Sequence, residues 1–142
     1  MIVRPWQLGD TRKILIQPAQ HYMYGLPEMD ADLTGLSNAG MAWTGEHEGE
    51  IVGIAGFTPQ WENRALAWAL ISESAGLHFV KIHSEVKKML TQAPFRRIEA
   101  HVDVGFQPGT RWMKMLDFEP EGYMKAFRPD GADMLLYARI RR

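Results

Sequence analysis

The chain has 142 residues, 46% of them hydrophobic, which fits a single domain with one core and excludes a disordered tail. Its net charge is −1 and it has no cysteine, so no global field draws it to nucleic acid or anionic lipid, and disulfides and thiolate metal sites are excluded. The longest apolar stretch, 65–71, is far shorter than the ~20 residues of a membrane-spanning helix, and we read no secretion signal, so we expect one cytoplasmic domain over residues 1–142.

The first half of the chain alternates short strands with weak helices. Residues 2–6 are predicted as a strand in which Pro5 favours a sheet edge. Asp10 is predicted as the N-cap of a first helix, whose apolar face begins at Ile14 and Leu15. A break at 22–27 precedes a second helix. The segments that follow read as that helix over 28–38 and strands over 41–47, 51–58 and 65–72.

The second half opens with the strongest helical periodicity, which begins near Ser74 and ends before Pro94. A strand over 97–104 and a short helix opened by Pro108 follow. The last hairpin has strands over 123–127 and 134–140, joined by a Pro-Asp-Gly turn. The order β-α-α-β-β-β-α-β-α-β-β predicts an α/β fold with a mixed, mostly antiparallel central sheet and helices on both faces.

Three stretches have a familiar form: 2–5 with Asp10, the run GEIVGIAG at 49–56, and the run WMKMLDFEPEG at 112–122. They resemble the opening strand and helix cap, the strand-turn-strand centre, and the last helix with its following strand in the GNAT superfamily of N-acetyltransferases. The stretch 101–138 also resembles small acetyltransferase-like proteins of short-tailed bacteriophages. The resemblance implies a GNAT-like fold that uses acetyl-CoA or another acyl-CoA as co-substrate, in the host cytoplasm if the chain is phage-encoded.

The resemblance also implies where acyl-CoA binds. In that family the cofactor lies where the central strand parts from the next parallel strand, with its diphosphate on free amides at the following helix N-terminus. The matching positions are Leu70, Ile71 and Ser72 for the pantetheine, and Ser74, Ala75, Gly76 and His78 for the diphosphate. The loop departs from the family's Gln/Arg-x-x-Gly-x-Gly/Ala pattern, and Glu73 would put a negative charge beside a diphosphate. The alternative is that Ser74 is a plain helix cap.

Catalytic candidates are few. Where the family often has Asn and Tyr, this chain has Phe106 and Met113, and methionine cannot protonate a leaving thiolate. His101 is the preferred base, because period-two spacing puts it on one face with two carboxylates that would raise its pKa. Those carboxylates are Glu99 and Asp103. A solvated strand face is the alternative, and Glu62, on the turn before the central strand, is the second choice of base.

Other side chains suggest fewer roles. The aromatic residues Tyr22, Tyr24 and Trp61 are candidates for lining an acceptor site, with core or rim packing as the alternative. His83 fits a core histidine and His47 a surface one, and no cluster has zinc-site spacing, so no metal is expected. The basic residues of 81–97 lack interleaved aromatics, which argues against nucleic-acid binding.

Two functional hypotheses follow. The first is an N-acyltransferase that moves an acetyl or similar acyl group from acyl-CoA to a primary amine of a small molecule or protein, with a homodimer as one expected state. The second is a catalytically degenerate GNAT-fold phage protein that acts by binding a host or virion protein. Fold-level similarity alone does not decide between them.

Overall fold

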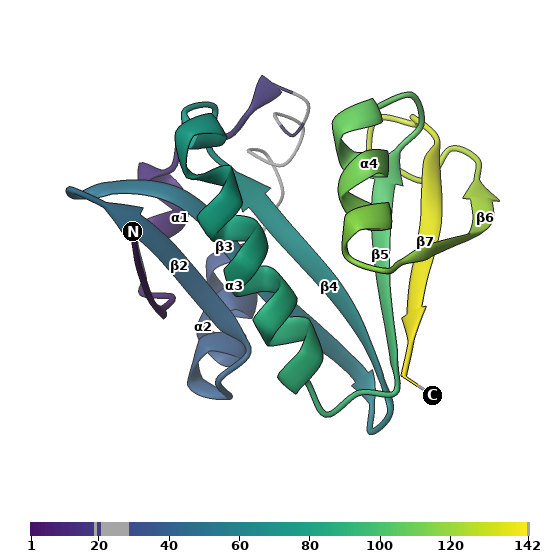
Figure 1. Cartoon of the computed structure of the whole chain (residues 1–142), viewed down its shortest axis with the longest axis horizontal. Coiled ribbons are helices and arrows are strands. Elements are labelled where there is room, and N and C mark those ends of the chain that lie inside the picture. The colour runs from purple at the N-terminus through teal and green to yellow at the C-terminus, as the bar shows by residue number, and fades with distance from the viewer. Residues whose placement is uncertain (19, 21–28, 142) are drawn as a thin grey trace. The chain divides into compact units, whose positions relative to one another are not determined.

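The computed structural model describes residues 1–18, 20 and 29–141, and its helices and strands follow the predicted order (Figure 1). Hydrogen bonds link seven strands in the order β1-β2-β3-β4-β5-β7-β6, and the sheet is mixed and mostly antiparallel. The predicted fold class is therefore confirmed. The chain forms two compact units, Met1–Thr58 with Trp68–Ala93 and Pro59–Ala67 with Pro94–Arg142. The expectation of one domain over 1–142 stays a prediction.

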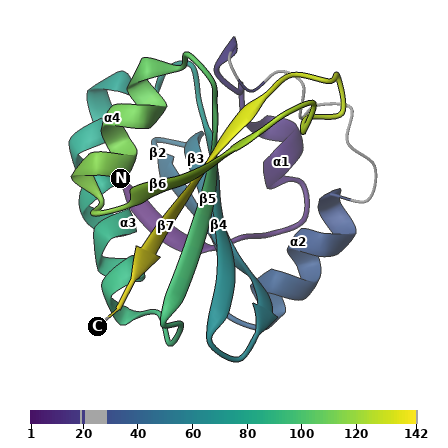
Figure 2. The same ribbon diagram turned by 90° about the vertical axis from the view of Figure 1, so that its right-hand side faces the viewer.

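The first unit holds helices on both faces of its strands. Figures 1 and 2 show α3 on one face and α1 and α2 on the other. Pro5 lies on the edge strand β1, as expected for a residue without an amide N–H. The elements of this unit are β1 (Ile2–Pro5), α1 (Asp10–Lys13), α2 (Met29–Asn38), β2 (Ala42–His47), most of β3 (Glu50–Trp61), the second half of β4 (Arg64–Ile71), the 3-10 turn η2 (Ala75–His78) and α3 (Phe79–Gln92).

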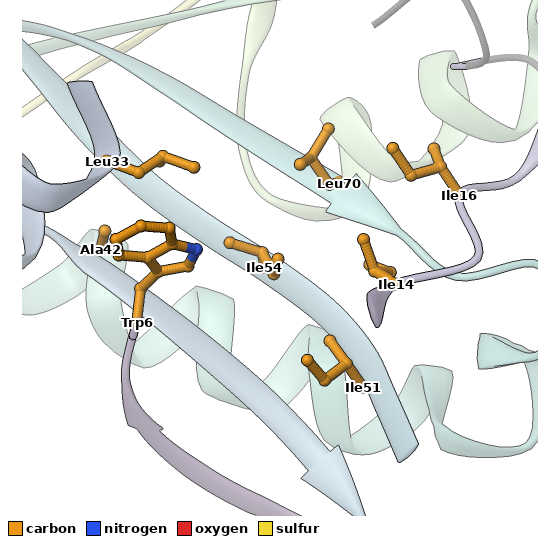
Figure 3. Close-up of a cluster of buried hydrophobic side chains, with 8 residues drawn as sticks. All are labelled: Trp6, Ile14, Ile16, Leu33, Ala42, Ile51, Ile54 and Leu70. Atoms are coloured by element: carbon orange, nitrogen blue, oxygen red, sulfur yellow. The ribbon is translucent and has the colours of Figure 1, made fainter. Parts of the chain in front are cut away.

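The core of the first unit is a cluster of buried apolar side chains between the strands and the α1–α2 side (Figure 3). Burying each large member contributes roughly 1.5–3 kcal/mol. The predicted helical face at Ile14 and Leu15 is wrong, because α1 ends before them and the chain continues extended, with Ile14 buried and Leu15 exposed. The cluster consists of Trp6, Ile14, Ile16, Leu33, Ala42, Ile51, Ile54 and Leu70.

Asp10 has a different role from the predicted helix cap. The N-cap is Gly9, at a φ of 100°, and Asp10 is the first helical residue with only 2% of its surface exposed. Its carboxylate accepts hydrogen bonds from Arg4 at 2.8 and 3.0 Å, from the Gln7 amide at 2.8 Å and from the Thr44 hydroxyl at 2.7 Å. Burial alone would raise its pKa, but these bonds, that from Arg4 foremost, lower the pKa of Asp10. Asp10 therefore ties β1 and β2 to α1.

The second unit is built on antiparallel pairs of β5 with β7 and of β7 with β6, with α4 packed against β5 (Figure 2). The first residues of β4 join it, because Arg64–Leu66 pair in parallel with Arg97–Glu99. In the ranges that the structure describes, no helix has the length and apolar character needed to cross a membrane. The further elements of this unit are β5 (Arg97–Asp103), α4 (Gln107–Met115), β6 (Glu119–Met124) and β7 (Met134–Ile140).

The last hairpin confirms the predicted turn but not the strand before it. Gly131, at a φ of 85°, donates its N–H to the Arg128 carbonyl at 2.8 Å, which closes the Pro-Asp-Gly turn. The predicted strand 123–127 is wrong, since β6 ends at Met124. Asp133 accepts a hydrogen bond from the Tyr123 hydroxyl at 2.6 Å, so side-chain bonds replace the ladder there.

Candidate functional site

The end of β4 presents two edges with different partners. The Ser72 N–H donates to the Val52 carbonyl of β3 at 3.1 Å. Because backbone groups of successive strand residues point to alternate edges, those of Ile71 and Ala69 point away from β3. Leu70, a predicted pantetheine residue, is 1% exposed and belongs to the core, and by the same alternation its backbone groups point towards β3.

The edge of β4 that points away from β3 is hydrogen-bonded by the segment that follows α1. The Ile71 N–H donates to Gln20 Oε1 at 2.9 Å, and Gln20 Nε2 donates to the Ala69 carbonyl at 2.7 Å. The Gln17 N–H donates to the Ile71 carbonyl at 2.8 Å. Sequence reasoning missed both glutamines, and the one signal was a pair of amide side chains three positions apart, just before the break at 22–27.

Two backbone N–H groups of the loop after β4 donate hydrogen bonds within the loop itself. Ser74 N–H donates to Ser72 Oγ at 3.2 Å, and Ala75 N–H donates to the Ser72 carbonyl at 3.1 Å. The helix predicted to begin near Ser74 begins as the 3-10 turn η2, and α3 starts only at Phe79. Two of the amides expected to be free for an anion are therefore hydrogen-bonded within the loop. At Gly76 an added Cβ would meet nothing within 4 Å, so that part of the loop is open.

Charged side chains surround this loop. The Ser74 hydroxyl donates to the carboxylate of Glu50, the first residue of β3. Glu73 is exposed, and its N–H donates to the Leu15 carbonyl at 2.8 Å. The His78 ring lies against the His47 ring, with centroids 4.5 Å apart. A diphosphate here would meet two carboxylates, one more than the sequence alone suggested.

His101 lies half-buried on β5 in the second unit, with its ring 4.9 Å from that of Phe127 in an edge-on contact. Burial lowers the pKa of His101, and the nearby Arg64 lowers it further, while Glu99 acts in the opposite direction. The predicted rise is therefore wrong, since desolvation outweighs the carboxylate. A neutral imidazole at about pH 7 results, and it can accept a proton.

Glu99 belongs to an ion-pair network, so the alternative of a solvated stripe fails for this residue. Its side chain is 8% exposed, and its carboxylate accepts from Arg64 at 2.5 and 2.9 Å and from Arg97 at 2.6 Å. Arg97 also bonds Glu121 at 2.5 and 3.2 Å. These contacts, the bond from Arg64 first, lower the pKa of Glu99 to about 2. At neutral pH Glu99 is ionised and fully engaged.

Glu62, the second candidate base, does not lie close to His101, the first. Glu62 lies in the turn between β3 and β4, next to Asn63, whose carbonyl accepts from the Arg97 N–H at 2.9 Å. That contact puts the turn at the beginning of β5. His101 lies on the order of 13 Å further along the strand, at about 3.3 Å per residue. The two residues are alternatives rather than partners.

The remaining candidates are dispersed. Trp61 ends β3 with 60% of its surface exposed, and the Arg64 guanidinium lies 4.6 Å from its ring. Tyr22 and Tyr24 lie outside the described residues. His83 is half-buried and stacks on Phe79, so the predicted core position is only partly correct. In the described part of the chain, no group of three or more His, Cys, Asp or Glu side chains is placed to hold a metal ion.

Comparisons with known proteins show the fold. No family model and no curated protein matches the sequence. The chain is similar to Ard1 from Thermoplasma volcanium, with a TM-score of 0.78 and 14% identity over 99% of this chain and 97% of that one. It is similar to ribosomal-protein-alanine N-acetyltransferase from Brucella melitensis, with a TM-score of 0.72 and 17% identity over 99% and 100%. It is also similar to a GNAT superfamily phosphinothricin acetyltransferase from Sinorhizobium meliloti in complex with AcCoA. The TM-score is 0.72, with 19% identity over 98% of this chain and 87% of that one.

Proposed function

We propose that this chain, which has the fold of GNAT acetyltransferases, transfers an acetyl or similar acyl group from acyl-CoA to a primary amine. The observation that supports this most is the similarity of fold over 98–99% of the chain to two acetyltransferases, one of them in complex with AcCoA. The amine nitrogen attacks the thioester carbonyl carbon, the C–S bond breaks, and the CoA thiolate takes up a proton. The amine loses one proton in the same reaction.

In this proposal His101 is the base and the end of β4 holds the cofactor. A half-buried imidazole with a lowered pKa is neutral at about pH 7 and can take a proton from the acceptor ammonium, which frees the lone pair of the amine for attack. Water protonates the thiolate, because Met113 is buried and has no proton to give. Trp61, with Tyr22 and Tyr24, remains the proposed acceptor lining. The residues proposed to bind the pantetheine and the diphosphate are the ones predicted from the sequence: Leu70, Ile71, Ser72, Ser74, Ala75, Gly76 and His78.

Acetyl-CoA is expected to raise the melting temperature of the protein by several degrees, since a ligand at about 100 times its Kd stabilises by about 2.7 kcal/mol. We expect His101→Ala to keep this shift and to lose about 100-fold in amine-dependent release of CoA thiol. Because the pKa of His101 is lowered by burial, wild-type activity should persist through the ordinary imidazole pKa of about 6.5 and should fall only at lower pH, where His101 becomes protonated. Differential scanning fluorimetry and a thiol-release assay measure both effects.

The controls separate the parts of this proposal. If Glu62→Gln loses activity while His101→Ala keeps it, the base is Glu62. No melting shift at millimolar acetyl-CoA would end the acyltransferase proposal altogether.

Replacing Glu50 by glutamine is expected to tighten CoA binding about fivefold, because a carboxylate bonded to Ser74 repels a diphosphate at that loop. The matched control is Glu48→Gln, which removes the same charge from an exposed turn residue whose nearby partner is His47 at 3.8 Å. Isothermal titration calorimetry at low and high salt measures the difference, which should shrink as salt screens the charge. Equal tightening by both variants would mean that net charge, and not the contact with Ser74, controls binding.

A second candidate function is a binding module without catalysis. Two large apolar side chains, Leu77 in η2 and Val80 at the start of α3, are 96% and 83% exposed, and Met113 replaces the usual proton donor. A stoichiometric protein partner whose capture is unaffected by His101→Ala would favour this function. The bacteriophage origin, the cytoplasmic location and the homodimer stay predictions.

A further inference from the structure

We propose that Gln20 is an internal competitor for the edge of β4, whose side-chain amide occupies the hydrogen-bonding groups that the pantetheine of acyl-CoA must use. This inference rests on the proposed function, because it names what the incoming cofactor displaces. The occupied groups are the carbonyl of Ala69 and the N–H of Ile71.

The Gln20 carboxamide has the same chemistry as an amide of a bound ligand. It offers one carbonyl acceptor and an N–H donor in one plane, as a peptide or pantetheine amide does. Its oxygen accepts from the Ile71 N–H at 2.9 Å and its nitrogen donates to the Ala69 carbonyl at 2.7 Å. An extended ligand adding to a strand edge uses the same donor and acceptor two residues apart. Gln20 and such a ligand cannot bind there together.

The chain is anchored at residues 15–17, shortly before Gln20, so the Gln20 side chain is the part that can leave. Ile16 is 1% exposed and forms an antiparallel bridge with Ser72. The Glu73 N–H donates to the Leu15 carbonyl at 2.8 Å, one residue before that bridge. Gln20 is half-buried, and its oxygen also accepts from Gln17 Nε2 at 3.3 Å. A change of side-chain rotamer frees the two groups on β4 without unfolding the anchor.

The two hydrogen bonds between Gln20 and β4 should weaken the binding of CoA by a measurable factor. A net hydrogen bond contributes about 0.5–1.5 kcal/mol, so two bonds correspond to roughly a tenfold preference for the occupied edge. Only the fraction of molecules with Gln20 displaced binds the pantetheine, which raises the apparent Kd by about that factor. Removing the side chain should therefore tighten binding of CoA about tenfold.

Two measurements on the full chain test this, with CoA as the probe. Amide exchange of Ile71, followed by NMR without ligand, should become at least several-fold faster in Gln20→Ala and in Gln20→Met, which keeps the length of the side chain but not its bonds. Calorimetry should show about tenfold tighter CoA binding by Gln20→Ala. Gln92→Ala, at the exposed end of α3, is the matched control and should change neither quantity.

The two measurements fail for different reasons. Unchanged Ile71 exchange in both Gln20 variants would overturn the internal contact. Faster exchange with CoA binding unchanged or weaker would overturn the competition while leaving the acyltransferase proposal standing. Binding of CoA by Gln20→Ala alone would support the inference strongly. Absence of CoA binding by every variant would overturn both the competition and the proposed function, and the exchange data would then decide the internal contact by itself.

Discussion

Replacing Gly56 by alanine is expected to lower the free energy of unfolding by about 3 kcal/mol, the upper part of the range for overpacked interiors. An added Cβ would lie 2.4 Å from the Met41 carbonyl oxygen and 2.5 Å from Cζ2 of Trp68. Neither neighbour can easily move, since the Met41 oxygen accepts from the Phe57 N–H at 2.9 Å and the Trp68 indole donates to Thr58 at 3.1 Å. The clash is with groups fixed by their own hydrogen bonds.

The matched control for this change is Gly53→Ala on the same strand. There the nearest atoms to an added Cβ are the Leu70 carbonyl at 3.6 Å and Ile71 Cδ1 at 3.8 Å, which are ordinary contacts. Gly53 also lines a small apolar cavity of about 40 Å³ beneath α3, which leaves room for a methyl group. Urea unfolding of both variants measures the difference. Equal losses would show that strand glycines matter for their flexibility here and not for their space.

Replacing Glu99 by glutamine is expected to cost about 2–3 kcal/mol of stability at neutral pH, somewhat less than a fully buried pair because its arginines are partly exposed. Glutamine keeps the shape but leaves Arg64 and Arg97 without the charge they surround. Glu99 has a folded-state pKa of about 2, below its ordinary 4.5. A lowered pKa gives stability that is present above about pH 4.5 and is lost as the pH falls towards 2.

The pH dependence distinguishes this charge effect from simple loss of packing. Wild-type stability should fall as the pH drops through that window, whereas the Glu99→Gln variant should show a shallower fall. Glu119→Gln, an exposed change on β6, is the control and should behave like the wild type. Parallel stability curves for wild type and Glu99→Gln would contradict the assignment of this charge network.

The order of the elements could be predicted because it follows local signals. Apolar periodicity marked α3, Pro94 marked its end, and Pro-Asp-Gly marked the last turn. The boundaries that failed depend on partners from elsewhere in the chain. The strand expected over 123–127 ended early because Asp133 binds the groups beside it, which no window of neighbouring residues reveals.

The candidate site was less accessible to sequence reasoning than the fold. His101 was found from alternation along β5, but the direction of its pKa shift depends on burial, which the sequence does not give. Gln20 was missed because its hydrogen bonds are to β4, about fifty residues away in the chain, and the sequence around Gln20 does not indicate that contact. Glu50 was missed because it meets Ser74 only through the pairing of distant segments.

The hairpin between β3 and β4 means that the carboxyl-terminal third of the chain does not contain every strand of its own unit. Pro59–Ala67 belongs with Pro94–Arg142, although the rest of β3 and β4 belongs elsewhere. A fragment that begins at Pro94 would lack β4, so the edge of β5 that pairs with β4 at Arg97–Glu99 would be left without hydrogen-bond partners. Glu99 would also lose its ion pair with Arg64. During synthesis, therefore, β5 pairs with a strand segment that precedes it in the chain by 33 residues, from Arg64 to Arg97.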